Sequence, residues 1–103
     1  MGAVKIDLGP GVVDLLRGLG EESLTVELVI DFEHDVMKSA VAFPGPGEPS
    51  LGYRRHRVGG VEVWWRQRLV LGFRTPQVSD RIQPRRVVVG RVGSALSAEA
   101  QYA

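Results

Sequence analysis

A Gly-Gly pair at positions 59–60 separates two stretches of alternating residues, and it constrains the fold more tightly than any other feature of the chain. Glycine accepts the positive φ angles of a two-residue hairpin turn, so this pair predicts a β-hairpin. In the register that such a turn imposes, Val63 and Trp65 face the protein core. The opposite, outer face of the hairpin holds Tyr53, Arg55, Arg57, Glu62, Trp64 and Arg66.

The outer face of this hairpin, within residues 53–68, supports two interpretations. Arginines among aromatic rings are typical of single-stranded nucleic-acid binding, in which cations contact phosphates and rings stack on bases. An ordinary basic sheet surface accounts for the same residues, because Glu62 can pair with Arg57 and Trp64 can stack with Arg55. We therefore expect weak nucleic-acid binding at most. The residues that would carry it are Tyr53, Arg55, Arg57, Trp64 and Arg66.

Alternation of apolar and polar residues predicts further strands along the chain. In the stretch 23–33, one face is apolar and the other, which includes Glu27 and Asp31, is acidic and wet, as in an antiparallel sheet. The second arm of the hairpin extends from residue 61 to about residue 74. The other expected strands are residues 4–8, 37–43 and 85–92.

Helical spacing occurs once. Apolar residues recur on one face of residues 12–19, ending with Leu19, and predict a short helix. Residues 44–50, with the sequence PGPGEPS, form a rigid polar loop that no strand or helix could contain. Residues 74–84 are a polar connection, and the small, polar tail 93–103 is either a marginal helix or frayed.

These elements predict an α+β fold: a β-rich antiparallel meander with one short N-terminal helix, in a small single domain. A chain of 103 residues is long enough to bury a core of its own without staples. The expected domain spans residues 1–103, with an ordered core at 4–92.

The composition excludes several chemistries. The chain has no cysteine, which excludes disulfides, zinc–thiolate sites, a thiol nucleophile and thiolate-bound iron–sulfur clusters. Residues 31–35, DFEHD, contain potential metal ligands, but the only histidine besides His34 is His56, and we expect a solvated acidic turn. Because no nucleophile–base spacing is present, we expect no metal, no cofactor and a non-enzymatic role, with a small enzyme of unfamiliar pattern as the remaining alternative.

Charge is divided unevenly along the chain. Residues 1–51 carry three basic and nine acidic side chains, a net −6, and residues 52–103 carry ten basic and three acidic ones, a net +7. This division predicts that the two halves attract each other within one chain or across a homodimer, and a nucleic-acid face is the alternative. Strands 24–32 and 85–92 could pair with a second copy if they lie at sheet edges.

The chain shows no membrane or targeting signal. No apolar run approaches the roughly 20 residues of a membrane span, and the first residues lack a signal-peptide core. We therefore expect a cytoplasmic protein with no membrane partner. The absence of asparagine and cysteine, together with eleven arginines against only Lys5 and Lys38, is compatible with a thermophilic source.

The order of the expected elements resembles that of the HesB-like A-type iron–sulfur carriers over roughly residues 4–80. The segments that carry the resemblance are VKIDL, VVDLLRGL, LTVELVIDF with MKSAVAF, GGVEVWW and GFRTPQVSD. The family places one cysteine near residues 34–37 and a pair after residue 80, and this chain lacks all of them. The resemblance implies the family's fold in a relative that does not carry a cluster.

The sequence as a whole predicts a non-enzymatic cytosolic binding domain. Its partner would be a second copy of the chain or another protein. A nucleic-acid-binding module that uses residues 53–68 is the alternative function.

Overall fold

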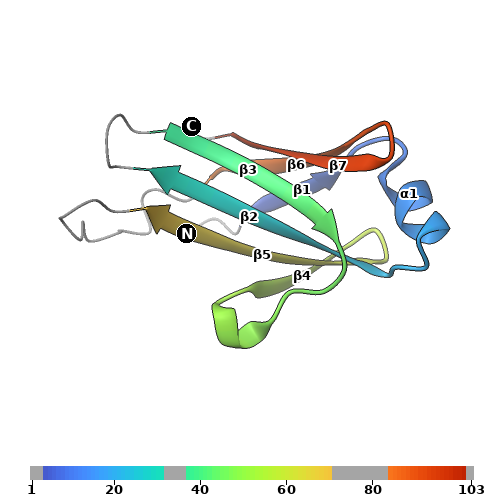
Figure 1. Cartoon of the computed structure of the whole chain (residues 1–103), viewed down its shortest axis with the longest axis horizontal. Coiled ribbons are helices and arrows are strands. Elements are labelled where there is room, and N and C mark those ends of the chain that lie inside the picture. The colour runs from blue at the N-terminus through green and yellow to red at the C-terminus, as the bar shows by residue number, and fades with distance from the viewer. Residues whose placement is uncertain (1–3, 32–36, 71–83, 102–103) are drawn as a thin grey trace.

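The computed structural model describes residues 4–31, 37–70 and 84–101. These residues form seven strands, one α-helix and one 3-10 turn, arranged as two mixed β-sheets (Figure 1). The α-helix, α1 (Val12–Gly18), lies at one end of both sheets (Figure 1). Within the described ranges, no helix has the length and apolar character needed to cross a membrane.

The first sheet joins the two ends of the described chain. Its strand order is β1 (Lys5–Leu8), β6 (Arg86–Val92) and β7 (Ala95–Gln101), with β1 parallel and β7 antiparallel to β6. An ion pair between Asp7 and Arg86 connects β1 to β6. This contact joins the acidic first half of the chain to its basic second half, as expected if the two halves attract each other within one chain.

The second sheet has the order β3 (Met37–Pro44), β2 (Ser23–Asp31), β5 (Val61–Val70) and β4 (Arg54–Val58). Strands β2 and β5 are parallel, whereas β3 and β4 are antiparallel to their neighbours. The expected antiparallel meander is therefore correct for the hairpins β2–β3 and β4–β5 and wrong for the parallel pairs β1–β6 and β2–β5. The antiparallel hairpin β6–β7 was not expected. Parallel strands are usually well buried, and the described apolar residues on the inner faces of β2 and β5 are 6% exposed or less.

This strand order also decides which strands are edges. Strand β2 lies between β3 and β5, and strand β6 lies between β1 and β7. The expectation that strands 24–32 and 85–92 could offer free edges to a second copy is therefore wrong, because both are already paired on each side.

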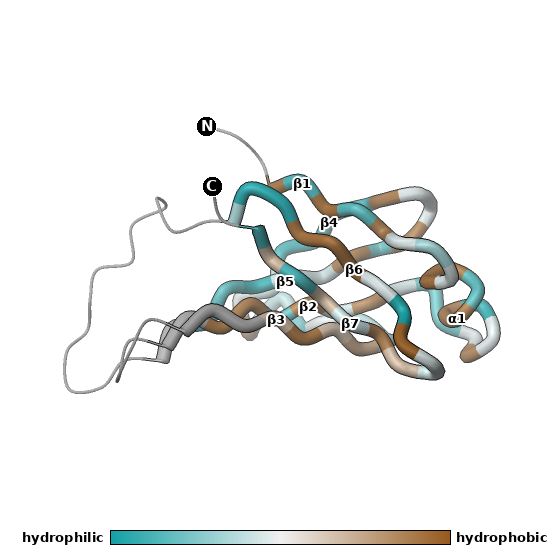
Figure 2. The backbone as a smooth tube through the Cα atoms, turned by 90° about the horizontal axis from the view of Figure 1, so that it is seen from above, coloured by the Kyte–Doolittle hydropathy of each residue, from teal (hydrophilic) through white to brown (hydrophobic). Residues whose placement is uncertain are grey.

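One hydrophobic core fills the space between the two sheets. In Figure 2, apolar segments recur along β6 and on α1, with polar segments between them. Strands β3 and β7 pack side by side and bring the two sheets together along one margin. The fully or almost fully buried apolar residues are Val4, Ile6, Val12, Leu16, Leu24, Val26, Leu28, Val61, Val63, Trp65, Val87 and Val89.

The predicted hairpin register is confirmed. Val58 pairs with Val61 across the Gly-Gly turn, and Arg55 pairs with Trp64. Both glycines have positive φ, as a primed turn requires. Val63 and Trp65 are buried, with exposed fractions of 0% and 6%.

The chain differs from the expectation at two element ends. The tail is neither helical nor frayed, because residues 95–101 form β7 and pair with β6 along its whole length. Leu96, Ala98 and Ala100 pack against the core, so the ordered core extends beyond residue 92. Helix α1 ends at Gly18, which leaves Leu19 outside the apolar face and 55% exposed.

Three expectations fall on residues outside the described ranges. The acidic turn at 31–35 and the polar connection at 74–84 lie there almost entirely, as does the part of the second hairpin arm beyond residue 70. All three stay predictions from the sequence.

Deleting residues 95–103 tests whether the tail is a structural strand. Loss of β7 removes the partner of β6 and the side chains that cover its core face, so we expect the midpoint of thermal unfolding to fall by at least about 8 °C, equivalent to roughly 1–2 kcal/mol. Circular dichroism would follow the transition. The matched control is Glu99→Gln, an exposed position on β7 that should unfold like the wild type. A truncated protein as stable as the wild type would contradict the assignment of β7.

Candidate functional site on the outer face of the hairpin

A loop at residues 45–53, here named the covering loop, lies over the outer face of the second sheet and contains the 3-10 turn η1 (Pro49–Leu51). It begins where β3 ends at Pro44, and the backbone N–H of Gly45 donates to the carbonyl of Ser23 at 2.9 Å. Thr25 Oγ1 donates to the carbonyl of Gly45 at 2.8 Å. Thr25 is consequently only 1% exposed.

This arrangement corrects two expectations. The outer face of β2 was expected to be wet, but the covering loop buries Thr25 at its centre. Residues 44–50 were expected to exclude regular structure, yet Pro44 ends β3 and Pro49 begins η1. Proline fits both places, because an edge strand and the first turn of a helix do not need its missing N–H.

Gly47 brings the covering loop into close contact with the aromatic residues of the hairpin region. A Cβ atom at this position would lie 2.9 Å from Tyr53 Cγ and 3.0 Å from Trp64 Cβ. Only glycine fits such a close approach without displacing its neighbours. Gly47 therefore packs against Tyr53, at the end of the covering loop, and against Trp64 of β5, the two aromatic residues predicted to stack on bases.

Glu27 is the central charged group beneath the covering loop. Its carboxylate accepts hydrogen bonds from Arg66 Nη2 at 3.1 Å and from the Tyr53 hydroxyl at 3.1 Å. It also forms an ion pair with Arg68, whose Nε lies 2.8 Å from Glu27 Oε1. The Glu27 side chain is only 14% exposed, so these contacts are largely shielded from water.

The surroundings of Glu27 keep its carboxyl ionised. Burial alone would raise its pKa, but hydrogen bonds from Arg66 and Tyr53 and the charges of Arg66 and Arg68 outweigh burial, and the pKa of Glu27 is lowered. Burial, and then the hydrogen bond to Glu27 and its negative charge, raise the pKa of Tyr53. The Tyr53 hydroxyl therefore stays protonated and serves as a donor.

Arg66 connects this buried group to the covering loop. Its Nη1 donates to the carbonyl of Leu51 at 3.0 Å, while its guanidinium carbon lies 4.5 Å from the centre of the Tyr53 ring. A single arginine thus holds the end of the loop, the ring and the carboxylate together. We call the group formed by Glu27, Tyr53, Arg66 and Arg68 the Glu27 cluster.

The predicted site residues therefore divide into groups. Tyr53 and Arg66 belong to the Glu27 cluster. Arg55 lies over the Trp64 ring at 5.8 Å, as predicted. Arg57 remains separate from all of them.

The ion pairing of the outer face differs from the prediction. Arg57 was expected to pair with Glu62, but Glu62 instead contacts Arg55, with Nη1 and Oε1 3.8 Å apart. Arg57 has no carboxylate within ion-pair distance among the described residues. It borders a hollow of about 540 Å³ between α1 and the hairpin turn, which Glu21 and Glu22 also line without pairing with it.

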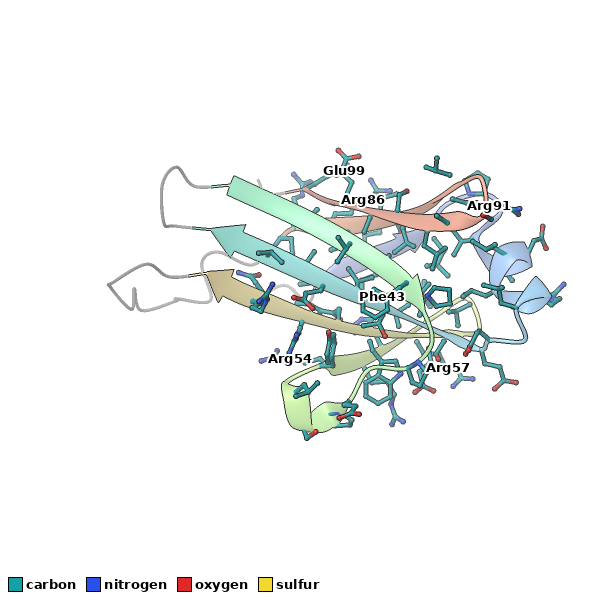
Figure 3. All side chains as sticks on the ribbon, viewed as in Figure 1. Phe43, Arg54, Arg57, Arg86, Arg91 and Glu99 are labelled. Carbon is teal, nitrogen blue, oxygen red and sulfur yellow. The ribbon has the colours of Figure 1, made fainter. Side chains whose placement is uncertain are left out.

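Three residues of this region did not stand out in the sequence. Glu27 and Arg68 form the cluster with Arg66 because β2 and β5 are parallel neighbours, with Glu27 directly opposite Arg66. Arg54, at the start of β4, is exposed and, like Arg57, has no carboxylate partner in the described part of the chain. In Figure 3, Arg54 and Arg57 lie toward opposite ends of β4.

The described residues contain no group of three or more histidine or acidic side chains able to hold a metal ion. Comparisons of this chain with family models, curated proteins and solved structures find no match. The site must therefore be interpreted from its own geometry and charge.

Glu27→Gln tests whether the carboxylate holds the covering loop. It leaves Arg66, which is 23% exposed, without its counter-ion, and we expect a loss of about 1–3 kcal/mol in the free energy of unfolding near neutral pH. Because the pKa of Glu27 is lowered in the folded protein, its contribution is present at neutral pH and is lost as the pH falls through that folded pKa. The variant should therefore lose less stability on acidification than the wild type.

Urea unfolding at neutral and acidic pH would measure both effects. Glu62→Gln is the matched control, since it breaks only the exposed contact to Arg55 and should cost less than about 0.5 kcal/mol. Equal stabilities of the wild type and the Glu27 variant at neutral pH would contradict the role of this carboxylate.

Proposed function

We propose that this chain is a non-enzymatic binding domain that recognises an acidic segment of another protein through the arginines of β4. The observation that carries the proposal is the separation of the described arginines into satisfied and unsatisfied groups. Arg66, Arg68 and Arg86 contact carboxylates within the chain. Arg54 and Arg57 do not, and both are exposed. Arg17, Arg85 and Arg91 also lack a carboxylate partner among the described residues, but they are scattered, whereas Arg54 and Arg57 lie on one strand.

The remaining arginine of β4 is also available to a partner. Arg55 is 66% exposed, and its contact with Glu62 spans 3.8 Å. Exposed ion pairs of this kind contribute about 0–1 kcal/mol, so a better-placed carboxylate can replace Glu62 at little cost. Strand β4 thus offers three cations within four residues, Arg55 and Arg57 on its outer face and Arg54 on the opposite face.

Nucleic acid is the less favoured partner of this surface. Stacking of bases needs free aromatic faces, but Arg66 and Gly47 contact Tyr53, while Arg55 and Gly47 contact Trp64. Without stacking, phosphate contacts alone give non-specific binding, with dissociation constants of about 10⁻⁴–10⁻⁶ M at physiological salt. These contacts compete with base stacking at both rings and are the reason that we favour a protein partner.

Self-association stays a separate prediction. If a second copy binds, it cannot add a strand to β2 or β6, since both are paired on each side. Val41 and Phe43 on β3 are exposed apolar side chains that such a contact could cover. The resemblance to the HesB-like carriers also stays a proposal; it concerns ancestry and assigns no role to the arginines of β4.

Fluorescence anisotropy with a labelled peptide of alternating glutamate and valine tests the proposed function. We expect salt-sensitive binding that Arg57→Ala weakens roughly two- to fivefold, as expected for one exposed charge contact. The matched control is Arg85→Ala, which removes an exposed arginine directly before β6, in the other sheet, and should leave the affinity unchanged. A peptide of alternating lysine and valine should not bind.

A single-stranded oligonucleotide of similar length supplies the competing outcome. Submicromolar binding of the oligonucleotide at physiological salt, lost in Trp64→Ala and without binding of the acidic peptide, would contradict the proposal. It would instead establish the hairpin as a nucleic-acid site.

A further inference from the structure

We infer that the acidic partner segment binds as an additional β-strand along the free edge of β4, with acidic side chains opposite Arg55 and Arg57. This inference rests on the proposed function and adds its binding mode. The free edge is the side of β4 that does not face β5.

The hairpin register determines which backbone groups of β4 point to the free edge. A two-residue turn makes Val58 and Val61 a hydrogen-bonded pair, and such pairs recur at every second residue of an antiparallel ladder. The N–H and C=O groups of Val58, His56 and Arg54 therefore face β5. Those of Arg55 and Arg57 face away from β5 and are available to another strand.

No described element occupies this edge. Strand β4 is the last strand of its sheet and pairs with β5 alone. Strand β1 approaches β4, but no backbone hydrogen bond in the described part of the chain joins the two. An extended segment can therefore complete the hydrogen bonds of Arg55 and Arg57 without displacing a described strand.

Arg55 and Arg57 also favour an added strand with acidic side chains. Directly opposite residues of neighbouring strands have side chains on the same face, so the residues that pair with Arg55 and Arg57 lie beside their guanidinium groups. Acidic side chains at these alternate positions would each gain an ion pair. The residue between them would lie on the face of His56.

The charge pattern also disfavours a second copy at this edge. An antiparallel contact between two β4 strands that is centred on His56 would place Arg55 of one copy opposite Arg57 of the other. Like charges directly opposite each other are destabilising, and charged edge strands are a common protection against self-pairing. The arginines of β4 thus favour an acidic chain over a copy of their own.

Backbone methylation of the peptide separates strand addition from simple charge attraction. We would measure binding of the wild-type protein to the glutamate–valine peptide and to two N-methylated forms of it. One form is methylated at every odd-numbered residue and the other at every even-numbered residue, so that only one of these two phases places its methyl groups toward β4. Methylation in the phase that faces β4 removes donors to its edge and should weaken binding by roughly three- to tenfold for each hydrogen bond lost. The other phase should weaken binding much less.

A pair of variants makes the same comparison from the protein side. Arg57→Ala removes the charge and keeps the backbone N–H, whereas Arg57→Pro removes both, and an edge strand tolerates proline where its N–H points outward. Strand addition predicts that Arg57→Pro binds the peptide more weakly than Arg57→Ala by roughly three- to tenfold. Circular dichroism checks that each variant is folded. If Arg57→Pro does not fold, the methylated peptides alone test strand addition.

The possible outcomes are distinguishable. Phase-dependent loss on methylation supports strand addition. Salt-sensitive binding that is indifferent to methylation in either phase overturns strand addition and leaves the proposed function standing. No binding of any acidic peptide overturns both.

Discussion

The outer half of this structure depends on the shielded carboxylate of Glu27. Its contacts with Arg66, Arg68 and Tyr53 join β2, β5 and the covering loop. Desolvation of so little exposed a carboxylate destabilises its ionised form. Hydrogen bonds from Arg66 and Tyr53 and the charges of Arg66 and Arg68 offset this cost. The covering loop thus shields the part of the outer face that holds Thr25, Glu27 and Arg66, at the parallel pair β2–β5. Arg55, Arg57 and Phe43 on the same sheet stay exposed.

The sequence was most informative where the determining interactions are local. The Gly-Gly turn predicted the complete register of β4 and β5, because the length of a hairpin loop fixes which residues face each other. It could not predict that Glu27 lies opposite Arg66, because that pairing joins strands far apart in the chain. The tail was predicted wrongly for a similar reason: Ala98 and Ala100 form a weak apolar pattern and pack against the core only because β7 pairs with β6.

The sequence predicted which residues lie at the candidate site but did not predict what most of them do. Tyr53, Arg55, Trp64 and Arg66 lie on one face as expected, yet they mostly hold the covering loop or contact one another. The basic character of the second half of the chain thus has two parts. Some arginines neutralise acids of the first half, and those of β4 remain exposed on a strand with one free edge, which is why we assign recognition to β4.

Titration of Glu27 by carbon-detected NMR of its side-chain carboxyl group tests this account most directly. The account predicts a pKa below that of an ordinary glutamate, with amide resonances of the covering loop shifting in the same titration, because the ionised carboxylate holds Arg66 and Arg66 holds the carbonyl of Leu51. A pKa at or above the ordinary value, or a covering loop that does not respond, would contradict the central role of Glu27.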